Sequence, residues 1–267
     1  MKIAADIVGH QAPAVEQRVD KRWLMAYSAG LGETQYPHPL FPVCYEWPAT
    51  HALRVSSGLE ALNARLVHAQ HDMTVHRAPR EGDVLGIAAQ VVAAMRRKPG
   101  AYVVFRMTAR DATGALVTIT DFGVLYRGVP LEGGERRIVP VEDPPPPDNL
   151  QPIGSIGVAA TAAHVYTECA RIWNPIHTDP DYARQAGLPG IILHGTATLA
   201  RSVSKALHAF KADARSVRRI QCRFSGMVLM PNTLDVAAAF SKNHISFETR
   251  KADGEVVVSR GRIELDG

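Results

Sequence analysis

Four consecutive prolines divide this chain of 267 residues almost in half, within residues 143–148, which read Asp-Pro-Pro-Pro-Pro-Asp. Because proline has no backbone N–H to donate and favours an extended conformation, such a run joins folded units rather than lying inside one. Both halves repeat one order of patterns, helix and then strands. Both also end in a strand, an aspartate-centred turn and a strand, at residues 101–126 and 244–265. The repeat predicts two copies of one unit, a helix packed on an antiparallel sheet.

The spacing of apolar residues gives the expected elements. Helical spacing predicts helices over residues 22–30, 163–172 and 191–210. Alternation, or runs rich in β-formers between turn residues, predicts strands at residues 73–76, 83–94, 101–108, 116–126, 217–224, 233–240, 244–249 and 256–265. Turns at residues 111–114 and 251–254 make each series a meander joined by hairpins. We expect an N-terminal domain at residues 1–135, a proline-rich linker at 136–155 and a C-terminal domain at 156–267.

Composition excludes several classes of protein. A hydrophobic content of 46% with 21% charged residues is typical of a soluble globular protein. No apolar run approaches the roughly 20 residues that cross a bilayer, and the N-terminus lacks the apolar core of a signal peptide. Cys44, Cys169 and Cys222 are an odd number without Cys-x-x-Cys spacing, so they indicate neither a disulfide framework nor a zinc site. We expect a cytoplasmic protein without membrane contact, metal or cofactor.

The formal net charge of +4 is carried by scattered basic residues. Proteins that bind nucleic acid usually show a denser basic stripe with stacking aromatic residues, whereas aromatic content here is 6%. No nucleic-acid partner is therefore expected. A small polyanionic ligand needs only a few cations at the mouth of a pocket, which this charge allows.

One short stretch concentrates chemically useful residues. It reads Asn174-Pro175-Ile176-His177, and it is followed by Asp179 and, after a short interval, by His194-Gly195. A turn former, a rigid proline, a titratable imidazole and a carboxylate within six residues exceed what a generic loop requires. Candidate functional residues are therefore expected here.

These motifs resemble the signature of the MaoC-like (R)-specific enoyl-CoA hydratases, Asp-x-Asn-Pro-x-His followed by His-Gly. The likeness runs nearly end to end: residues 20–32 are similar to the opening helix of the type 2 enzymes, and His68-Ala69-Gln70-His71 is similar to their His-Gly-Glu-Gln region. The resemblance implies an α+β class and a tandem (double) hotdog, in which each half is an antiparallel β-sheet wrapped around a central helix. It also implies that a degenerate first half shapes the acyl pocket while the second half supplies catalysis.

The same resemblance assigns roles. It places His177, Asn174 and Gly195 in the catalytic set, with His177 as the acid–base histidine and the Gly195 N–H facing the thioester carbonyl. His194 and Asp179 are expected to support them. Two alternatives remain open: His177 is a buried histidine that only caps its loop, and Asn174 only shapes the turn.

One position departs from the pattern. Where the family has its catalytic aspartate, five residues before the histidine, this chain has Ile172. Glu168 lies one helical turn earlier on the same face and is the candidate replacement acid, although one turn is about 5.4 Å. The alternative is that Glu168 is a solvated helix carboxylate.

The expected function is that of a lyase of fatty acid metabolism, a MaoC-like acyl-CoA hydratase or dehydratase. It adds or removes water at a 2-enoyl or 3-hydroxyacyl thioester with an atypical acid–base site. The partner is an acyl-CoA or acyl-carrier thioester, and the resemblance implies a homodimer. The alternatives are a non-catalytic acyl-CoA or acyl-carrier binding protein and a thioesterase, for which no convincing nucleophile is present.

Overall fold

The computed structural model describes residues 1–266 and forms two compact units. The first unit contains Met1–Val19, Tyr45–Arg77 and Asp83–Asp143. The second contains Asp20–Cys44, Ala78–Gly82 and the chain from Pro144 onward. The second unit therefore takes two segments from the N-terminal half of the sequence.

The first unit is built on an antiparallel sheet with the strand order β2-β4-β5-β6-β3. Its strands are β2 (Gln11–Arg18), β3 (Leu66–Val75), β4 (Val84–Arg97), β5 (Gly100–Arg110) and β6 (Leu116–Arg127). Short pieces complete it: β1 (Ile3–Ala4), η1 (Ala5–Ile7), η2 (Leu59–Arg65), β7 (Leu131–Glu132) and β8 (Arg136–Arg137). Most of α2 (Pro42–Ser56) belongs to this unit, and Tyr45 on α2 hydrogen-bonds to Thr118 on β6 at 3.0 Å.

A buried carboxyl group also joins α2 to β6. Glu46 is 2% exposed, and its Oε1 accepts hydrogen bonds from the hydroxyls of Thr118 at 3.1 Å and Thr120 at 2.8 Å. Burial raises the pKa of Glu46 to about 7, and the two threonine hydrogen bonds oppose this shift. The first unit thus contains a carboxyl group that stays largely protonated below neutral pH.

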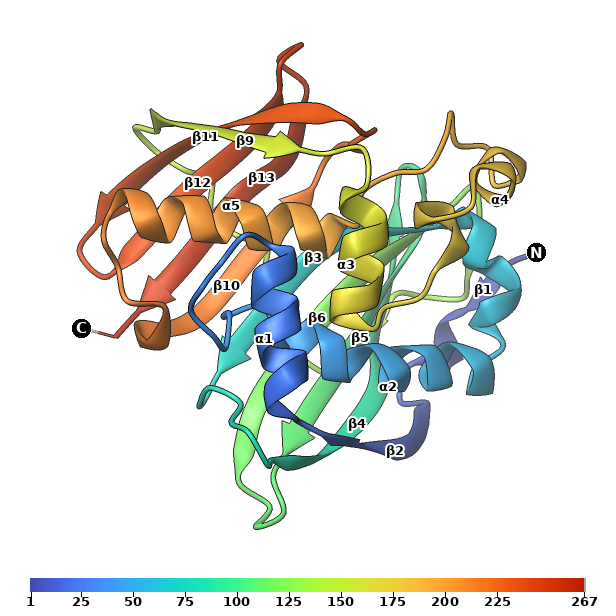
Figure 1. Cartoon of the computed structure of the whole chain (residues 1–267). Coiled ribbons are helices and arrows are strands. Elements are labelled where there is room, and N and C mark those ends of the chain that lie inside the picture. Colours follow the sequence, from blue (N-terminus) through green and yellow to red (C-terminus); the bar gives the residue numbers. More distant parts are fainter. Residues whose placement is uncertain (267) are drawn as a thin grey trace. The chain divides into compact units, whose positions relative to one another are not determined.

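The second unit repeats the plan, with the strand order β10-β13-β12-β11-β9, again antiparallel. The strands are β9 (Gln151–Val158), β10 (Val217–Phe224), β11 (Asn232–Ser241), β12 (His244–Lys251) and β13 (Val256–Leu265). The helices are α1 (Lys21–Gly30), α3 (Ala162–Ala170), η3 (Pro175–His177), α4 (Pro180–Gln185), α5 (Gly195–Ala209) and η4 (Ala214–Ser216). Figure 1 shows α5 lying across β9, β11, β12 and β13.

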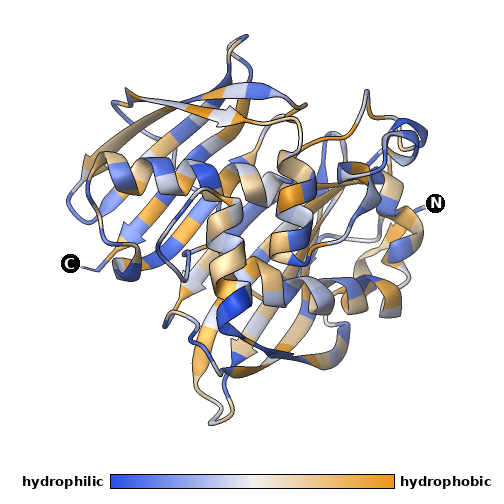
Figure 2. Ribbon diagram, viewed as in Figure 1, coloured by the Kyte–Doolittle hydropathy of each residue, from blue (hydrophilic) through white to orange (hydrophobic). Residues whose placement is uncertain are grey.

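Small and hydroxylated residues let α5 pack closely on its sheet. Ala197, Ala200 and Ala206 are fully buried, and the Ser202 hydroxyl hydrogen-bonds to that of Thr249 on β12 at 2.7 Å. Buried and more exposed residues alternate along much of β11 and β12, which gives these strands one face for the helix, and Figure 2 shows hydrophobic and hydrophilic bands on the strands of this sheet.

Helices α1 and α3 also pack against each other within the second unit. A Cβ atom on Gly30 would lie 3.0 Å from both Cβ and Sγ of Cys169, which is tighter than ordinary van der Waals contact. The absence of a side chain at Gly30 therefore lets the end of α1 approach α3.

The structure confirms the α+β class and the predicted meanders. The strand predictions at residues 217–224 and 256–265 coincide with β10 and β13. The helix prediction at residues 191–210 was wrong at its start, because residues 191–194 are irregular and the Leu193 N–H donates to the carbonyl of Val228 at 2.8 Å. The helix predicted at 163–172 ends at Ala170, because Arg171 takes a φ of +56°.

Helix α2 and strands β2 and β9 are among the elements that were not predicted. Helix α2 contains Pro48 in its interior, and a proline in a helix interior removes a hydrogen bond. Strands β2 and β9 each contain a proline, and β9 contains two glycines as well. Strand β9 begins inside the segment assigned to the linker. Among the described residues, no helix has both the length and the apolar character needed to cross a membrane.

We expect Glu46 to make stability depend on pH. Its pKa is raised in the folded state, so the carboxyl stabilises the fold at low pH, and this contribution is lost as pH rises from about 4.5 through 7. Relative to Glu46→Gln, wild type should lose on the order of 3 kcal/mol of unfolding free energy between pH 5 and pH 8. Denaturant unfolding of both proteins across this range measures the difference. Parallel pH profiles would contradict the assignment.

Candidate active site

The loop that carries His177 is fixed by its own side chains. Asn174 caps the short helix η3, because its Oδ1 accepts a hydrogen bond from the N–H of Ile176 at 3.3 Å. Pro175 occupies the first helical position, where a missing N–H costs nothing. Asn174 therefore uses its carbonyl oxygen to shape the turn.

Asp179 caps the next helix in the same way. Its Oδ1 accepts from the N–H of Asp181 at 2.9 Å and of Tyr182 at 3.0 Å, at the start of α4. Its own N–H donates to the carbonyl of Pro175 at 2.8 Å. Asp179 thus ties α4 to the loop that carries His177.

The His177 ring is held by one strong hydrogen bond. Its Nδ1 lies 2.7 Å from the carbonyl oxygen of Ile192, which can only accept, so Nδ1 carries the proton and Nε2 carries the lone pair. His177 is buried at 9% exposure, and burial lowers its pKa to about 4, although the Ile192 hydrogen bond opposes the shift. At neutral pH, His177 is an uncharged base with a fixed tautomer.

His194 packs directly on His177. The two rings are stacked at an interplanar angle of 24° with centroids 3.6 Å apart, and Nε2 of His194 lies 3.3 Å from the Thr167 hydroxyl. Burial, and then the neighbouring His177, hold the pKa of His194 well below its ordinary value. His194 therefore packs against His177 as an uncharged aromatic ring.

Gly195 begins α5 immediately after His194. The first N–H groups of a helix have no partner inside the helix, and they lie at the positive end of its dipole. A Cβ on Gly195 would lie 3.2 Å from Cε1 of Phe224, so a side chain here would crowd that ring. The helix start therefore offers N–H groups to an oxygen with developing negative charge.

A chain of hydroxyl groups reaches the same helix start. Tyr166 on α3 donates to Oγ1 of Thr196 at 3.0 Å, and the hydroxyls of Tyr166 and Tyr27 lie 3.3 Å apart. Tyr27 in turn donates to the carbonyl of Leu40 at 3.2 Å. Sequence reasoning missed this chain, because helical spacing identified Tyr27 only as an apolar residue of its helix and gave no signal for its hydroxyl.

Ile172, at the position where the sequence resemblance expects an aspartate, is a buried apolar side chain. It is 5% exposed, and its N–H donates to the carbonyl of Thr167 at 3.1 Å. The side chain can neither accept nor donate a proton.

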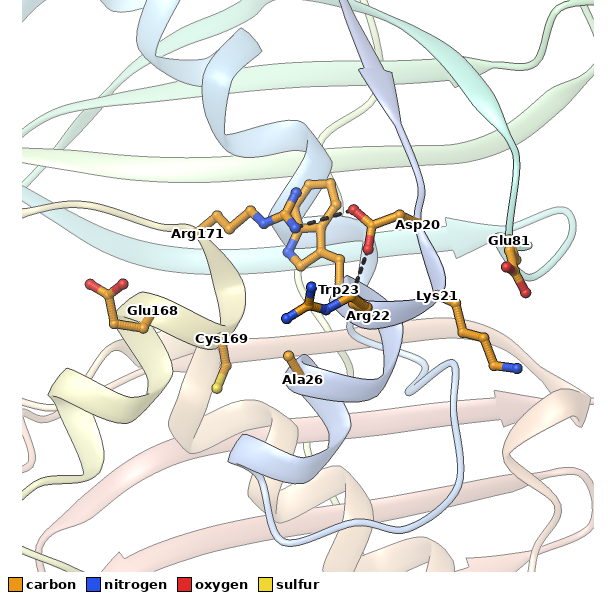
Figure 3. A pocket seen from close by; sticks show the side chains of 9 residues that line it. All are labelled: Asp20, Lys21, Arg22, Trp23, Ala26, Glu81, Glu168, Cys169 and Arg171. Carbon is orange, nitrogen blue, oxygen red and sulfur yellow. Dashed lines mark hydrogen bonds and ion pairs between the residues drawn. The ribbon is translucent and has the colours of Figure 1, made fainter.

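Glu168, the candidate replacement acid, lies on the exposed face of α3. It lines a surface cavity of about 580 Å³ with Asp20, Lys21, Arg22, Trp23, Ala26, Glu81, Cys169 and Arg171. In Figure 3, Arg171 reaches over the Trp23 indole, at 4.3 Å from the ring centroid, and bonds to Asp20 at 3.2 Å. Thr167, the neighbour of Glu168, contacts His194 through its hydroxyl.

The structure therefore brings His177, His194 and Gly195 together and gives Asn174 and Asp179 capping roles in the same loop. Among residues 1–266, no group of three histidine, cysteine or carboxylate side chains could hold a metal ion.

Each of the two units contains a helix on an antiparallel sheet. Two such units in one chain are the double hotdog architecture. Solved structures support it. A MaoC-like dehydratase from Phytophthora capsici is 19% identical, with a TM-score of 0.78 over 95% of this chain and 96% of that one. A Mycobacterium tuberculosis protein described as having a double hotdog fold is 15% identical, with a TM-score of 0.67 over 97% of this chain and 96% of that one. The predicted tandem hotdog is confirmed.

Family models then identify the two halves. Residues 154–261 match the MaoC like domain, and residues 8–120 match the FAS1-like, dehydratase domain region. The chain thus contains a MaoC-like domain preceded by a FAS1-like dehydratase region. A curated relative, peroxisomal multifunctional enzyme type 2 of Mus musculus, is 26% identical over 97% of this chain and 38% of its own length. This chain therefore spans well under half of that relative.

We predict that His177 stays neutral far below the usual range of histidine. Because burial lowers its pKa to about 4, its Nδ1–H tautomer should persist through pH 5.5. NMR titration of ¹⁵N-histidine-labelled protein, with the signal assigned by its loss in His177→Gln, measures the midpoint. A midpoint near 6.5 would show that the ring is not buried in the way described.

Proposed function

We propose that this chain adds water to, or removes it from, a 2-enoyl or 3-hydroxyacyl thioester at a MaoC-like site. One observation carries the proposal: Nδ1 of His177 is bonded to the Ile192 carbonyl, which leaves Nε2 as a neutral base on a ring that stacks on His194, the residue before the start of α5 at Gly195. A base for water and donors for an enolate oxygen are what this reaction requires.

In the hydration direction, Nε2 of His177 takes a proton from water as the water oxygen bonds to the β-carbon. The electron pair of the double bond moves toward the thioester carbonyl, whose oxygen gains negative charge. The N–H of Gly195 and the positive end of α5 stabilise that charge. A proton must then reach the α-carbon.

Ile172 has no proton to supply to the α-carbon. We propose that the His177 imidazolium returns the proton it has taken, so that one ring serves first as base and then as acid. Glu168 remains the alternative acid predicted from the sequence, and its exposed position on α3 weighs against it.

A second candidate function is non-catalytic binding of an acyl-CoA or acyl-carrier thioester. The buried Ile172 favours it, because loss of one partner of an acid–base pair typically slows a reaction by about 10²- to 10⁴-fold. Retention of His177 and of the Gly195 helix start favours catalysis, since binding alone does not require a fixed tautomer.

The domain boundaries, the oligomeric state and the location of the protein are also proposed. We propose residues 1–135 and 156–267 as the two hotdog domains, joined by residues 136–155, a homodimer of such chains, and a cytoplasmic location. Relatives named as hydratases support the class of reaction: enoyl-CoA hydratase 2, peroxisomal, of Arabidopsis thaliana is 29% identical over 36% of this chain and 31% of its own length.

The assay that tests the reaction follows loss of the enoyl absorbance of crotonyl-CoA with purified protein. Wild type should turn over, and His177→Ala should lower kcat by about 10²-fold or more, because it removes the imidazole whose Nε2 is the proposed base. Asp181→Asn, at an exposed carboxylate of α4, serves as a control and should retain wild-type activity. Equal activity of His177→Ala and wild type would exclude His177 as the base. No turnover by wild type, together with tight binding of crotonyl-CoA, would favour the binding function.

The source of the second proton is tested by two substitutions. Ile172→Asp should raise kcat, because it places a second acid–base group at the position the family uses. Glu168→Gln should leave kcat unchanged if His177 delivers the proton. A large loss of activity in Glu168→Gln, with an unchanged melting temperature, would instead assign the acid role to Glu168.

A further inference from the structure

We propose that the Thr196 hydroxyl donates a second hydrogen bond to the thioester carbonyl oxygen, beside the N–H of Gly195, and that Tyr166 is the positioning residue that directs this donor. The inference rests on the proposed function and extends it to residues outside the signature motif.

The direction of the hydroxyl chain is the first argument. Tyr166 donates to Oγ1 of Thr196 at 3.0 Å, so the Thr196 oxygen acts as acceptor and keeps its own proton for another bond. No hydrogen bond donated by the Thr196 side chain occurs among residues 1–266. An oriented hydroxyl with an unused proton is therefore present at the start of α5.

The position of Thr196 in α5 also supports the proposal. Thr196 directly follows Gly195 in the first turn of α5, at the positive end of the helix dipole. Both residues are half-buried, whereas the four residues that follow them are buried. The hydroxyl therefore lies at the part of the helix that a ligand oxygen can reach, where each added donor strengthens stabilisation of an oxyanion.

The rigidity of Tyr166 is the third argument. Its side chain is 1% exposed, and its ring lies 4.9 Å from that of His194. Burial holds the pKa of Tyr166 far above neutrality, so the phenol stays a donor. Tyr166 therefore packs its ring against His194 and, through its hydroxyl, directs the Thr196 hydroxyl.

The test compares Thr196→Val, Thr196→Ser and Tyr166→Phe with wild type in the crotonyl-CoA assay. Thr196→Val keeps the shape of the side chain and should lower kcat by about 10²-fold with little change in KM, as loss of one oxyanion donor does. Thr196→Ser restores the hydroxyl and should recover most of the activity. Tyr166→Phe should lower kcat by less than Thr196→Val, because the hydroxyl remains but loses its fixed direction.

A matched control lies two residues further along the same helix. The Thr198 hydroxyl donates to the carbonyl of His194 within α5, so Thr198→Val removes a hydroxyl that serves the helix alone and should keep wild-type kcat. Melting temperatures of all variants separate loss of folding from loss of the donor. Equal kcat for Thr196→Val and wild type, or equal losses in the Ser and Val variants, would overturn the proposal.

A binding measurement tests the contact between Thr196 and the thioester oxygen without requiring turnover. Cinnamoyl-CoA absorbs at longer wavelength when its carbonyl is polarised, so its band should shift on binding to wild type and shift less with Thr196→Val. If wild type turned over no substrate, the proposed reaction would fail, while the band would still report whether Thr196 contacts the thioester oxygen. An identical shift in both proteins would overturn the inference.

Discussion

The site depends on the hydrogen bond between Nδ1 of His177 and the carbonyl of Ile192, at 2.7 Å. This bond joins the loop before α4 to the irregular segment that leads into α5, and it decides which ring nitrogen is basic. The caps by Asn174 and Asp179 hold the loop that presents the ring. The segment that includes Ile192 is in turn held by Leu193, whose N–H donates to Val228. If the Ile192 carbonyl turned away, the tautomer and the direction of Nε2 would both be lost.

The resting site is assembled from uncharged groups. Burial lowers the pKa of both stacked histidines, and they hydrogen-bond to the Thr167 hydroxyl and the Ile192 carbonyl rather than to carboxylates. In the family pattern an aspartate would add a negative charge, and Ile172 removes it. In the proposed reaction, charge then arises only as a pair, imidazolium on His177 and enolate at the start of α5. The helix dipole favours the anion of this pair, and the anion stabilises the cation.

Much of the fold could be predicted because it depends on local patterns. The hairpins at residues 101–126 and 244–265 combine alternating β-formers with aspartate and glycine turns, and the structure contains both. Helix α2 could not be predicted, because Pro48 interrupts its sequence while the contacts of Tyr45 and Glu46 with β6 are long-range. For the site, the motif placed His177, His194 and Gly195 together. It could not indicate that Tyr166 and Tyr27 donate hydrogen bonds, because a tyrosine in a helix has the same periodicity whether its hydroxyl is used or not.

The pH dependence of kcat/KM for hydration of crotonyl-CoA tests the central claim, that a buried neutral His177 is the acid–base group, most directly. Because burial lowers the pKa of His177 to about 4, kcat/KM should be constant from pH 8 down to about 5 and then fall with a slope of one as the ring becomes protonated. A fall centred near pH 6.5 would contradict the described site. A profile that was unchanged by His177→Ala would assign the chemistry to another group.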